Sequence, residues 1–317
     1  MKNYDLSGKL CLLCLSVFFL SGCGTMVKDW QKDRSFAGNI ARVSDVPKVP
    51  DDVSIEKITS QANLSTEEKA DMAIALGSGM AATTSSLAHG ASLGMSMVDG
   101  LIWSFWMSSP SWQSTSWSIW LPEHEASSKE EAEVKIKKML EQAMAVTGKE
   151  FIEKNKELIP IDISKIQYVN SFGFVSSNGK FINYKPEQRY FTGYRGIIDN
   201  GPSVTVCEFS LSSIDYDLNI KLLDMPDEMG GGKAWTSRME TGNFFTAFCT
   251  RYPKDRSSKI EFLTKFNALE FYSDLSEKLP KYFYLLIPPR SNIHFSDEKY
   301  INVPIVINEG KVYFFAK

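Results

Sequence analysis

The sequence predicts an α+β protein, in which a small-residue helix or helical hairpin precedes a mainly antiparallel β-sheet domain with two amphipathic helices. Beyond Ile159, runs of residues that alternate between polar and apolar indicate half-buried strands. Two stretches with apolar residues at helical spacing border and interrupt these runs. Strands in runs broken by helices are typical of α+β folds. Ahead of them, the run from Met72 to Val98 contains no Asp, Glu, Lys or Arg.

The charge-free run from Met72 to Val98 can follow a capping box at Ser65–Glu68 as a helix. One continuous helix would be about 40 Å long, enough to cross a bilayer core of about 30 Å. A bend near His89-Gly90 would instead make a helical hairpin. Small residues recur at a spacing of four, which forms a groove that a second helix can approach. These residues are Ser78, Ala82, Ser86, Gly90 and Gly94. We expect an oligomerisation surface in or at the membrane; burial in the protein's own core is the alternative.

Tryptophans follow this run at short intervals, at Trp103, Trp106, Trp112, Trp117 and Trp120. The tryptophan ring is apolar and its N–H is polar, so the residue favours the membrane–water interface. The expectation is therefore an interface cluster. The same rings could equally fill the core of the domain that follows.

The α+β domain is expected to span residues 126–317 and to open with a helix. Ser127 and Ser128 are each followed three residues later by a glutamate, as in a capping box, and apolar residues at helical spacing continue to about Asn155. A second helix is expected near Leu263–Leu279, and the Ser212-Ser213 pair is expected to turn a hairpin. The expected strands are Ile166–Val175, Arg189–Ile198, Ile214–Leu222, Phe244–Thr250, Lys281–Ile287, Val303–Ile307 and Val312–Phe315.

The N-terminus carries Lys2 and Lys9, then an apolar core from Leu10 to Leu20 that is too short to span a bilayer. This core ends in Leu-Ser-Gly-Cys, which resembles the lipobox of bacterial lipoproteins. The resemblance implies cleavage before Cys23 and acylation of that cysteine. Residues 1–22 would then be a signal peptide, residues 23–64 a lipidated N-terminus and flexible tether, and residues 65–125 the helical membrane and oligomerisation segment. Gly24, in place of Asp, implies export to the outer membrane in a Gram-negative host.

Charge and cysteine content narrow the class of protein further. The net charge of −3 lacks the basic footprint of a nucleic-acid-binding protein. Once the signal peptide and the lipidated Cys23 are set aside, Cys207 and Cys249 remain. In an oxidising compartment they are expected to form a disulfide; two free buried thiols are the alternative.

Motifs that would support catalysis or metal binding are incomplete. Met229–Ala234 lacks the leading glycine and the final hydroxyl of a P-loop, so a flexible surface loop is expected. Glu123-His124-Glu125 lacks His-Glu-x-x-His spacing, and no Gly-x-Ser-x-Gly elbow occurs. The expectation is a protein that is not an enzyme, with no cofactor and no metal.

The start LSGCGTM and the later Gly-, Ala- and Ser-rich segment resemble the surface-exclusion lipoproteins of conjugative plasmids, over residues 20–26 and 72–100. The resemblance implies ring-like oligomers in the outer membrane. We therefore predict a non-enzymatic outer-membrane lipoprotein that self-associates through residues 72–98. It would serve surface exclusion, conjugative transfer or a secretion apparatus, with the bilayer, further copies of the chain and other envelope proteins as partners. The second reading is a periplasmic module that binds a ligand or partner, and the third is a hydrolase of envelope polymers.

Overall fold

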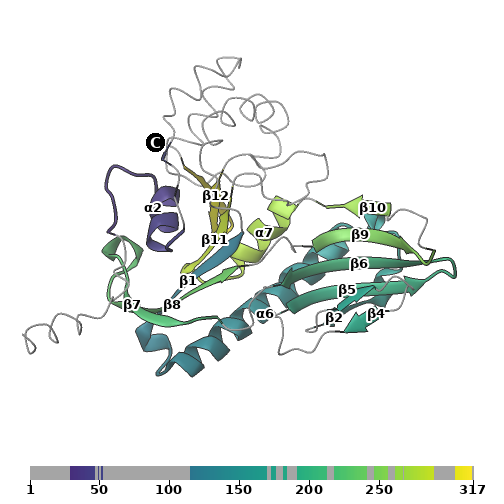
Figure 1. Cartoon of the computed structure of the whole chain (residues 1–317), viewed down its shortest axis with the longest axis horizontal. Helices are drawn as coiled ribbons and strands as arrows, with labels where there is room; N and C mark the ends of the chain where they lie inside the picture. The colour runs from purple at the N-terminus through teal and green to yellow at the C-terminus, as the bar shows by residue number, and fades with distance from the viewer. Residues whose placement is uncertain are drawn as a thin grey trace, which may run out of the picture.

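The computed structural model describes residues 29–46, 49, 51–52, 115–169, 173–175, 181–183, 191–212, 218–240, 246–255, 261–266, 268–288 and 304–315. Across these residues the protein is α+β, as the alternating and helical patterns predict. Two antiparallel sheets lie along the long axis of the molecule, and helices pack on them (Figure 1).

The six-stranded sheet has the order β13-β12-β11-β1-β8-β7, and each neighbouring pair is antiparallel. β1 lies inside this sheet, so a strand near residue 120 pairs with β11, which comes far later in the chain. The strands are β1 (Ser116–Pro122), β7 (Lys221–Asp224), β8 (Lys233–Glu240), β11 (Phe283–Ile287), β12 (Ile305–Asn308) and β13 (Lys311–Phe314).

The five-stranded sheet has the order β10-β9-β6-β5-β2 and is also antiparallel throughout. A separate two-stranded ribbon joins β3 to β4. The strands are β2 (Ile166–Val169), β3 (Gly173–Val175), β4 (Phe181–Asn183), β5 (Phe191–Asp199), β6 (Ser203–Ser212), β9 (Thr246–Pro253) and β10 (Glu261–Lys265).

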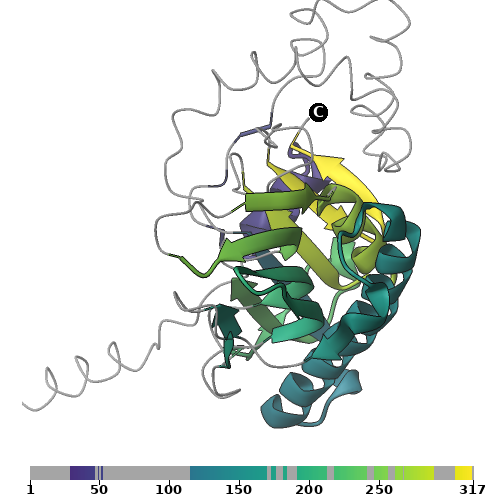
Figure 2. The ribbon, with the colours of Figure 1, turned by 90° about the vertical axis from the view of Figure 1, so that its right-hand side faces the viewer.

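The longest helix of the described chain, α6 (Lys129–Lys154), begins where the capping box predicts. The Ser128 hydroxyl accepts a hydrogen bond from the Glu131 N–H at 3.2 Å, and the Ser127 N–H donates to the Glu131 carboxylate at 2.8 Å. α6 packs on β5 and β6 and contacts α7 (Ala268–Glu277). Figure 2 shows α6 along one side of the sheets.

A third helix, α2 (Phe36–Val43), packs on β12 and β13. Single 3-10 turns complete the described elements: η1 (Glu123–Glu125), η2 (Lys156–Leu158), η3 (Ile163–Lys165) and η5 (Asp227–Met229).

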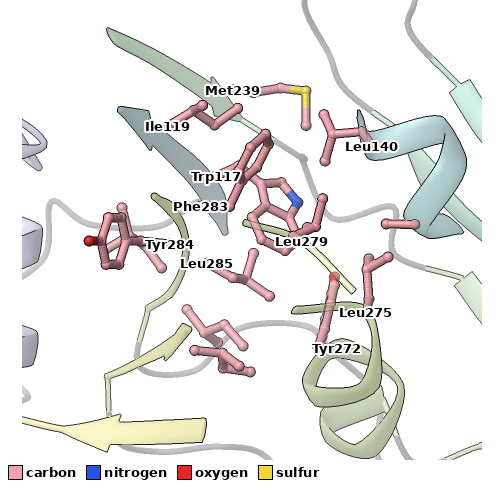
Figure 3. Packing of buried hydrophobic residues seen from close by; sticks show 14 of the residues in the cluster. Trp117, Ile119, Leu140, Met239, Tyr272, Leu275, Leu279, Phe283, Tyr284 and Leu285 are labelled. Atoms are coloured by element: carbon pink, nitrogen blue, oxygen red, sulfur yellow. The ribbon is translucent and has the colours of Figure 1, made fainter. Parts of the chain in front are cut away.

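The six-stranded sheet is covered on both faces. On one face, Trp117 lies against Phe283 with ring centroids 6.4 Å apart, and Leu140 from α6 and Leu275 from α7 complete the cluster (Figure 3). On the other face Tyr284 points the opposite way, toward α2 (Figure 3). The sheet is therefore the middle layer between α2 and the pair α6 and α7.

The predicted division of the chain is wrong in two places. Residues 29–46 were expected in a flexible tether, but they form a turn and α2, which has six buried residues. Residues 116–122 were expected in a helical membrane segment, but they form β1 in the middle of a sheet. Both stretches belong to the α+β domain because their apolar side chains complete its core.

The prediction around the Ser212-Ser213 pair is also wrong. Among the described residues, β6 pairs with β5 and β9, and β7 pairs with β8 in the other sheet, so β6 and β7 form no hairpin. Residues 213–217, where the turn was expected, lie outside the described residues. Leu218 and Ile220 are buried without strand pairing, and Asn219 between them has φ of 43°. The alternation at residues 218–220 therefore reflects burial outside a strand, and Ile214–Asp217 lie outside the described residues.

Candidate functional site

The beginning of α2 joins two parts of the chain. Ser35 is the N-cap, and its hydroxyl accepts a hydrogen bond from the Gly38 N–H at 3.0 Å. Asp52 accepts hydrogen bonds from both the backbone N–H and the hydroxyl of Ser35. Arg34 donates to Asp51 at 2.9 Å. Residues 51–52 are therefore fixed to the N-terminal end of α2.

The chain before α2 lies along the helix. The Asn39 side chain accepts from the Gln31 N–H at 2.8 Å and donates to the Gln31 carbonyl at 2.8 Å. The Arg42 guanidinium donates to the Asp29 carbonyl at 3.2 Å. These bonds fasten residues 29–31 to the middle and end of α2.

The C-terminal end of α2 is joined to β1. The Ser44 hydroxyl donates to the Ser118 hydroxyl at 2.6 Å, and both groups are buried. Arg238 on β8 donates to the Asp45 carbonyl at 3.2 Å and to the Ser116 hydroxyl at 3.3 Å. The start of β1 therefore lies beside the end of α2.

Aromatic rings fill the space between α2 and the sheet. The Phe36 ring centroid lies 4.6 Å from that of Tyr313 and 6.3 Å from that of Tyr284, and Trp30 packs on the outer side at 6.0 Å. Burial raises the pKa of Tyr284 to about 12, so its hydroxyl stays neutral at physiological pH. The junction is thus apolar at its centre and hydrogen-bonded at its rim.

This arrangement fixes three points of the chain on one face of the six-stranded sheet: Asp29, Asp52 and the start of β1 at Ser116. α2 has eight residues and is about 12 Å long. The three points therefore lie within roughly 20 Å of one another, allowing for side-chain reach. We call this set of contacts, at residues 29–46, 51–52 and 116–118, the α2 junction. Its hydrogen bonds and ring contacts hold α2 against the six-stranded sheet.

The sequence contains a signal for α2 that the predictions missed. Phe36, Ile40 and Val43 have helical spacing, and Ser35 precedes them as a possible N-cap. Gly38 and Asn39 weaken the helical pattern, because both residues have low helix propensity.

Most of the predicted site residues lie outside the described residues. These are the proposed lipidation site Cys23, the proposed oligomerisation residues Ser78, Ala82, Ser86, Gly90 and Gly94, and the proposed interface residues Trp103, Trp106 and Trp112.

For Trp117 and Trp120 the prediction of a membrane interface is wrong. Their side chains are 0% and 2% exposed, because β1 lies between β8 and β11 with both faces covered. The Trp120 N–H donates to the Ser118 hydroxyl at 3.0 Å, so its polar group is satisfied inside the protein. The alternative from the sequence, that these rings fill the core of the domain, holds for these two residues.

The predicted disulfide between Cys207 and Cys249 is confirmed. The two residues lie directly opposite each other on β6 and β9, with Cα atoms 4.0 Å apart, and both are fully buried. The bond joins two neighbouring strands on the face that also carries Phe209, whose ring packs on Phe151 of α6.

A charged cluster that the sequence did not predict lies on the opposite face of the five-stranded sheet. Arg195 on β5 lies directly opposite Glu208 on β6, and the guanidinium donates to the carboxylate at 2.7 Å. The Ser210 hydroxyl donates to the same carboxylate at 3.0 Å. A buried, hydrogen-bonded ion pair of this kind fixes strand register and is not by itself evidence of chemistry.

The two remaining candidate motifs lie at turns of the chain. Gly230, Gly231 and Gly232 all have positive φ, at 125°, 67° and 78°, and turn the chain between β7 and β8. Glu125 forms an ion pair with Lys135 at 2.5 Å at the start of α6. In the part of the chain that the structure describes, no group of three or more His, Cys, Asp or Glu side chains is arranged to hold a metal ion.

Among the helices of the described residues, none combines the length and apolar character that a membrane crossing requires. Comparison with known proteins adds no relative: no protein family model, no curated protein and no solved structure matches this chain.

Proposed function

We propose that this protein is an outer-membrane lipoprotein that serves as a non-enzymatic structural component of a cell-envelope assembly. It is anchored through acylated Cys23 and self-associates through Met72–Val98. The assembly is a surface-exclusion, conjugative transfer or secretion apparatus. The observation that carries this proposal is the N-terminal apolar core followed by Leu20-Ser21-Gly22-Cys23.

Two physical considerations support the anchor. Each methylene of an acyl chain that enters the bilayer contributes about 0.8 kcal/mol, so several chains hold a protein essentially permanently. The disulfide between Cys207 and Cys249 is of a kind that persists in oxidising compartments, as expected for an exported protein.

Self-association is supported by the composition of Met72–Val98. Glycine costs about 1 kcal/mol relative to alanine in a helix, and small residues leave voids in a core. Close approach of a second helix to the small-residue stripe offsets this cost through packing and interhelical contacts.

The test is to replace Gly90 and Gly94 together by Leu and to measure the native mass in detergent. The two added side chains block close helix approach, so the variant should dissociate to smaller species while the parent remains an oligomer. The α+β domain reports folding independently, through the cooperativity of its unfolding.

A matched control replaces Ala88 and Ser92 by Leu. On a helix these positions lie on the side opposite Gly90 and Gly94, so this variant should assemble like the parent. If the Gly90→Leu, Gly94→Leu variant has the mass of the parent oligomer, the stripe is not the interface. Loss of folding throughout the protein would mean that the run is part of the core.

A further inference from the structure

We infer that the α2 junction is the membrane-facing side of this protein and that lipid headgroups are the surface it lies against. The inference rests on the proposed acylation of Cys23 and adds an orientation to it. Two independent features of chain connectivity carry it.

The first feature is the length of chain between the proposed anchor and the fold. Asp29 is already fixed to Arg42 of α2, so only residues 24–28 separate it from Cys23. Fully extended, this link reaches about 20 Å. The 26 residues of α6 alone span about 39 Å. The link is therefore shorter than the protein, and the side that carries Asp29 must stay nearest the bilayer.

The second feature is where residues 53–114 leave and rejoin the described fold. Asp52 is bonded to Ser35 at one end of α2, and Ser116 is bonded to Arg238 at the other end. Both ends of this stretch thus start from the face that carries Asp29. A stretch that crossed a bilayer once would have its ends on opposite sides, which one folded domain does not allow. Any part of residues 53–114 that enters the membrane must return to the side it came from.

The charges on this surface do not account for the orientation. The exposed residues Lys32, Asp33, Asp45 and Asp51 comprise one base and three acids, so this surface is not the basic patch that binds anionic lipids through charge. The orientation comes instead from the short link to Cys23 and from the position of Asp52 and Ser116, the two ends of residues 53–114, at the α2 junction. Raising the salt concentration should leave it unchanged, because salt screens charge–charge interactions and does not weaken a covalent link.

The five-stranded sheet then projects away from the membrane. Figure 1 shows α2 at one end of the long axis and the turn between β5 and β6 at the other. Pro202 in this turn is exposed, as is Lys32 within the α2 junction. These two positions provide a matched pair for measuring orientation.

The experiment compares full-length, membrane-extracted Lys32→Cys and Pro202→Cys variants, each labelled with an environment-sensitive fluorophore. Both are reconstituted into vesicles of phosphatidylethanolamine and phosphatidylglycerol that carry a nitroxide on the lipid headgroup. Quenching should be several-fold stronger at position 32 than at position 202, and it should persist in 0.5 M salt, a concentration chosen as roughly threefold above physiological ionic strength.

Equal quenching at the two positions, stronger quenching at position 202, or loss of the difference in salt would overturn the orientation. The intact mass of each sample reports acylation separately. A protein that is acylated but quenched equally contradicts only the orientation, whereas a protein that carries no acyl chain contradicts the proposed function itself.

Discussion

At the scale of single residues, Trp117 and Trp120 contribute to the core in different ways. Trp117 packs on Phe283 in the core of the six-stranded sheet, and its N–H is buried with no hydrogen-bond partner among the described residues. The ring therefore contributes by volume and apolar area rather than by a polar contact. Trp120 differs, because its N–H donates to Ser118.

Replacing Trp117 by Ala should lower the free energy of unfolding by about 3–5 kcal/mol, since it leaves a large cavity. Trp117→Phe should cost less, because the phenyl ring leaves a much smaller cavity. Urea denaturation of the full chain in detergent measures both. Val134, which is 66% exposed, provides the control: Val134→Ala should change the free energy by no more than about 0.5 kcal/mol. A stable Trp117→Ala variant would mean that β1 is not in the core.

The start of α6 makes a pH-dependent contribution at the same scale. Hydrogen bonds from the Ser127 hydroxyl and backbone N–H lower the pKa of Glu131 below the usual value of a glutamate. A carboxylate with a lowered pKa stabilises the folded state above its unfolded pKa, and this contribution is lost as the pH falls through the folded pKa. Ser127→Ala should therefore lower the melting temperature at pH 7, and the difference from the parent should shrink below about pH 4.5.

A Glu131→Gln background tests the origin of this pH dependence. Gln keeps an acceptor oxygen but does not titrate, so Ser127→Ala in this background should have the same effect at every pH. Melting temperatures of the four proteins between pH 3 and pH 7 make the comparison. A pH dependence that survives in the Gln background would assign it to another group.

At the scale of elements, the disulfide is the strongest local constraint between β6 and β9. The two cysteines are 42 residues apart in the chain. On the chain-entropy model, closing a loop of this length contributes about 4 kcal/mol. In urea denaturation, the double variant Cys207→Ala, Cys249→Ala should have a free energy of unfolding lower by about 4 kcal/mol. The parent protein, once reduced, should lose a similar amount. Reaction of both thiols with maleimide in unreduced, denatured protein would contradict the bond.

Most elements of the α+β domain could be predicted from the sequence, including β11 and β12, which are fully buried, but β1 could not. α6 was found because its capping serines and apolar stripe are local signals, and the strands β5, β9, β11, β12 and β13 were each found within a few residues of their ends. β1 was missed because its two tryptophans, with serines around them, continue the series that starts at Trp103. Tryptophans at such short intervals resembled an interface cluster.

At the scale of the whole molecule, the α2 junction could not be predicted because it depends on contacts between distant segments. Ser44 and Ser118 are 74 residues apart, and Asp45 and Arg238 are 193 apart. Nothing local in the polar stretch after Cys23 indicates these partners, so it resembled a flexible tether. The disulfide was easier, since only two cysteines remain after the proposed signal peptide and lipidation site are removed.

The account as a whole depends on Cys23, because the anchor, the compartment and the orientation of the α2 junction all follow from it. The most direct measurement is the intact mass of the protein extracted from membranes, followed by sequencing of its N-terminal peptide. The account predicts a chain that begins at Cys23 and carries the added mass of acyl chains on that residue, and a Cys23→Ser variant that is neither acylated nor cleaved at this position. A chain that begins at another residue, or at Cys23 without acyl chains, would contradict it.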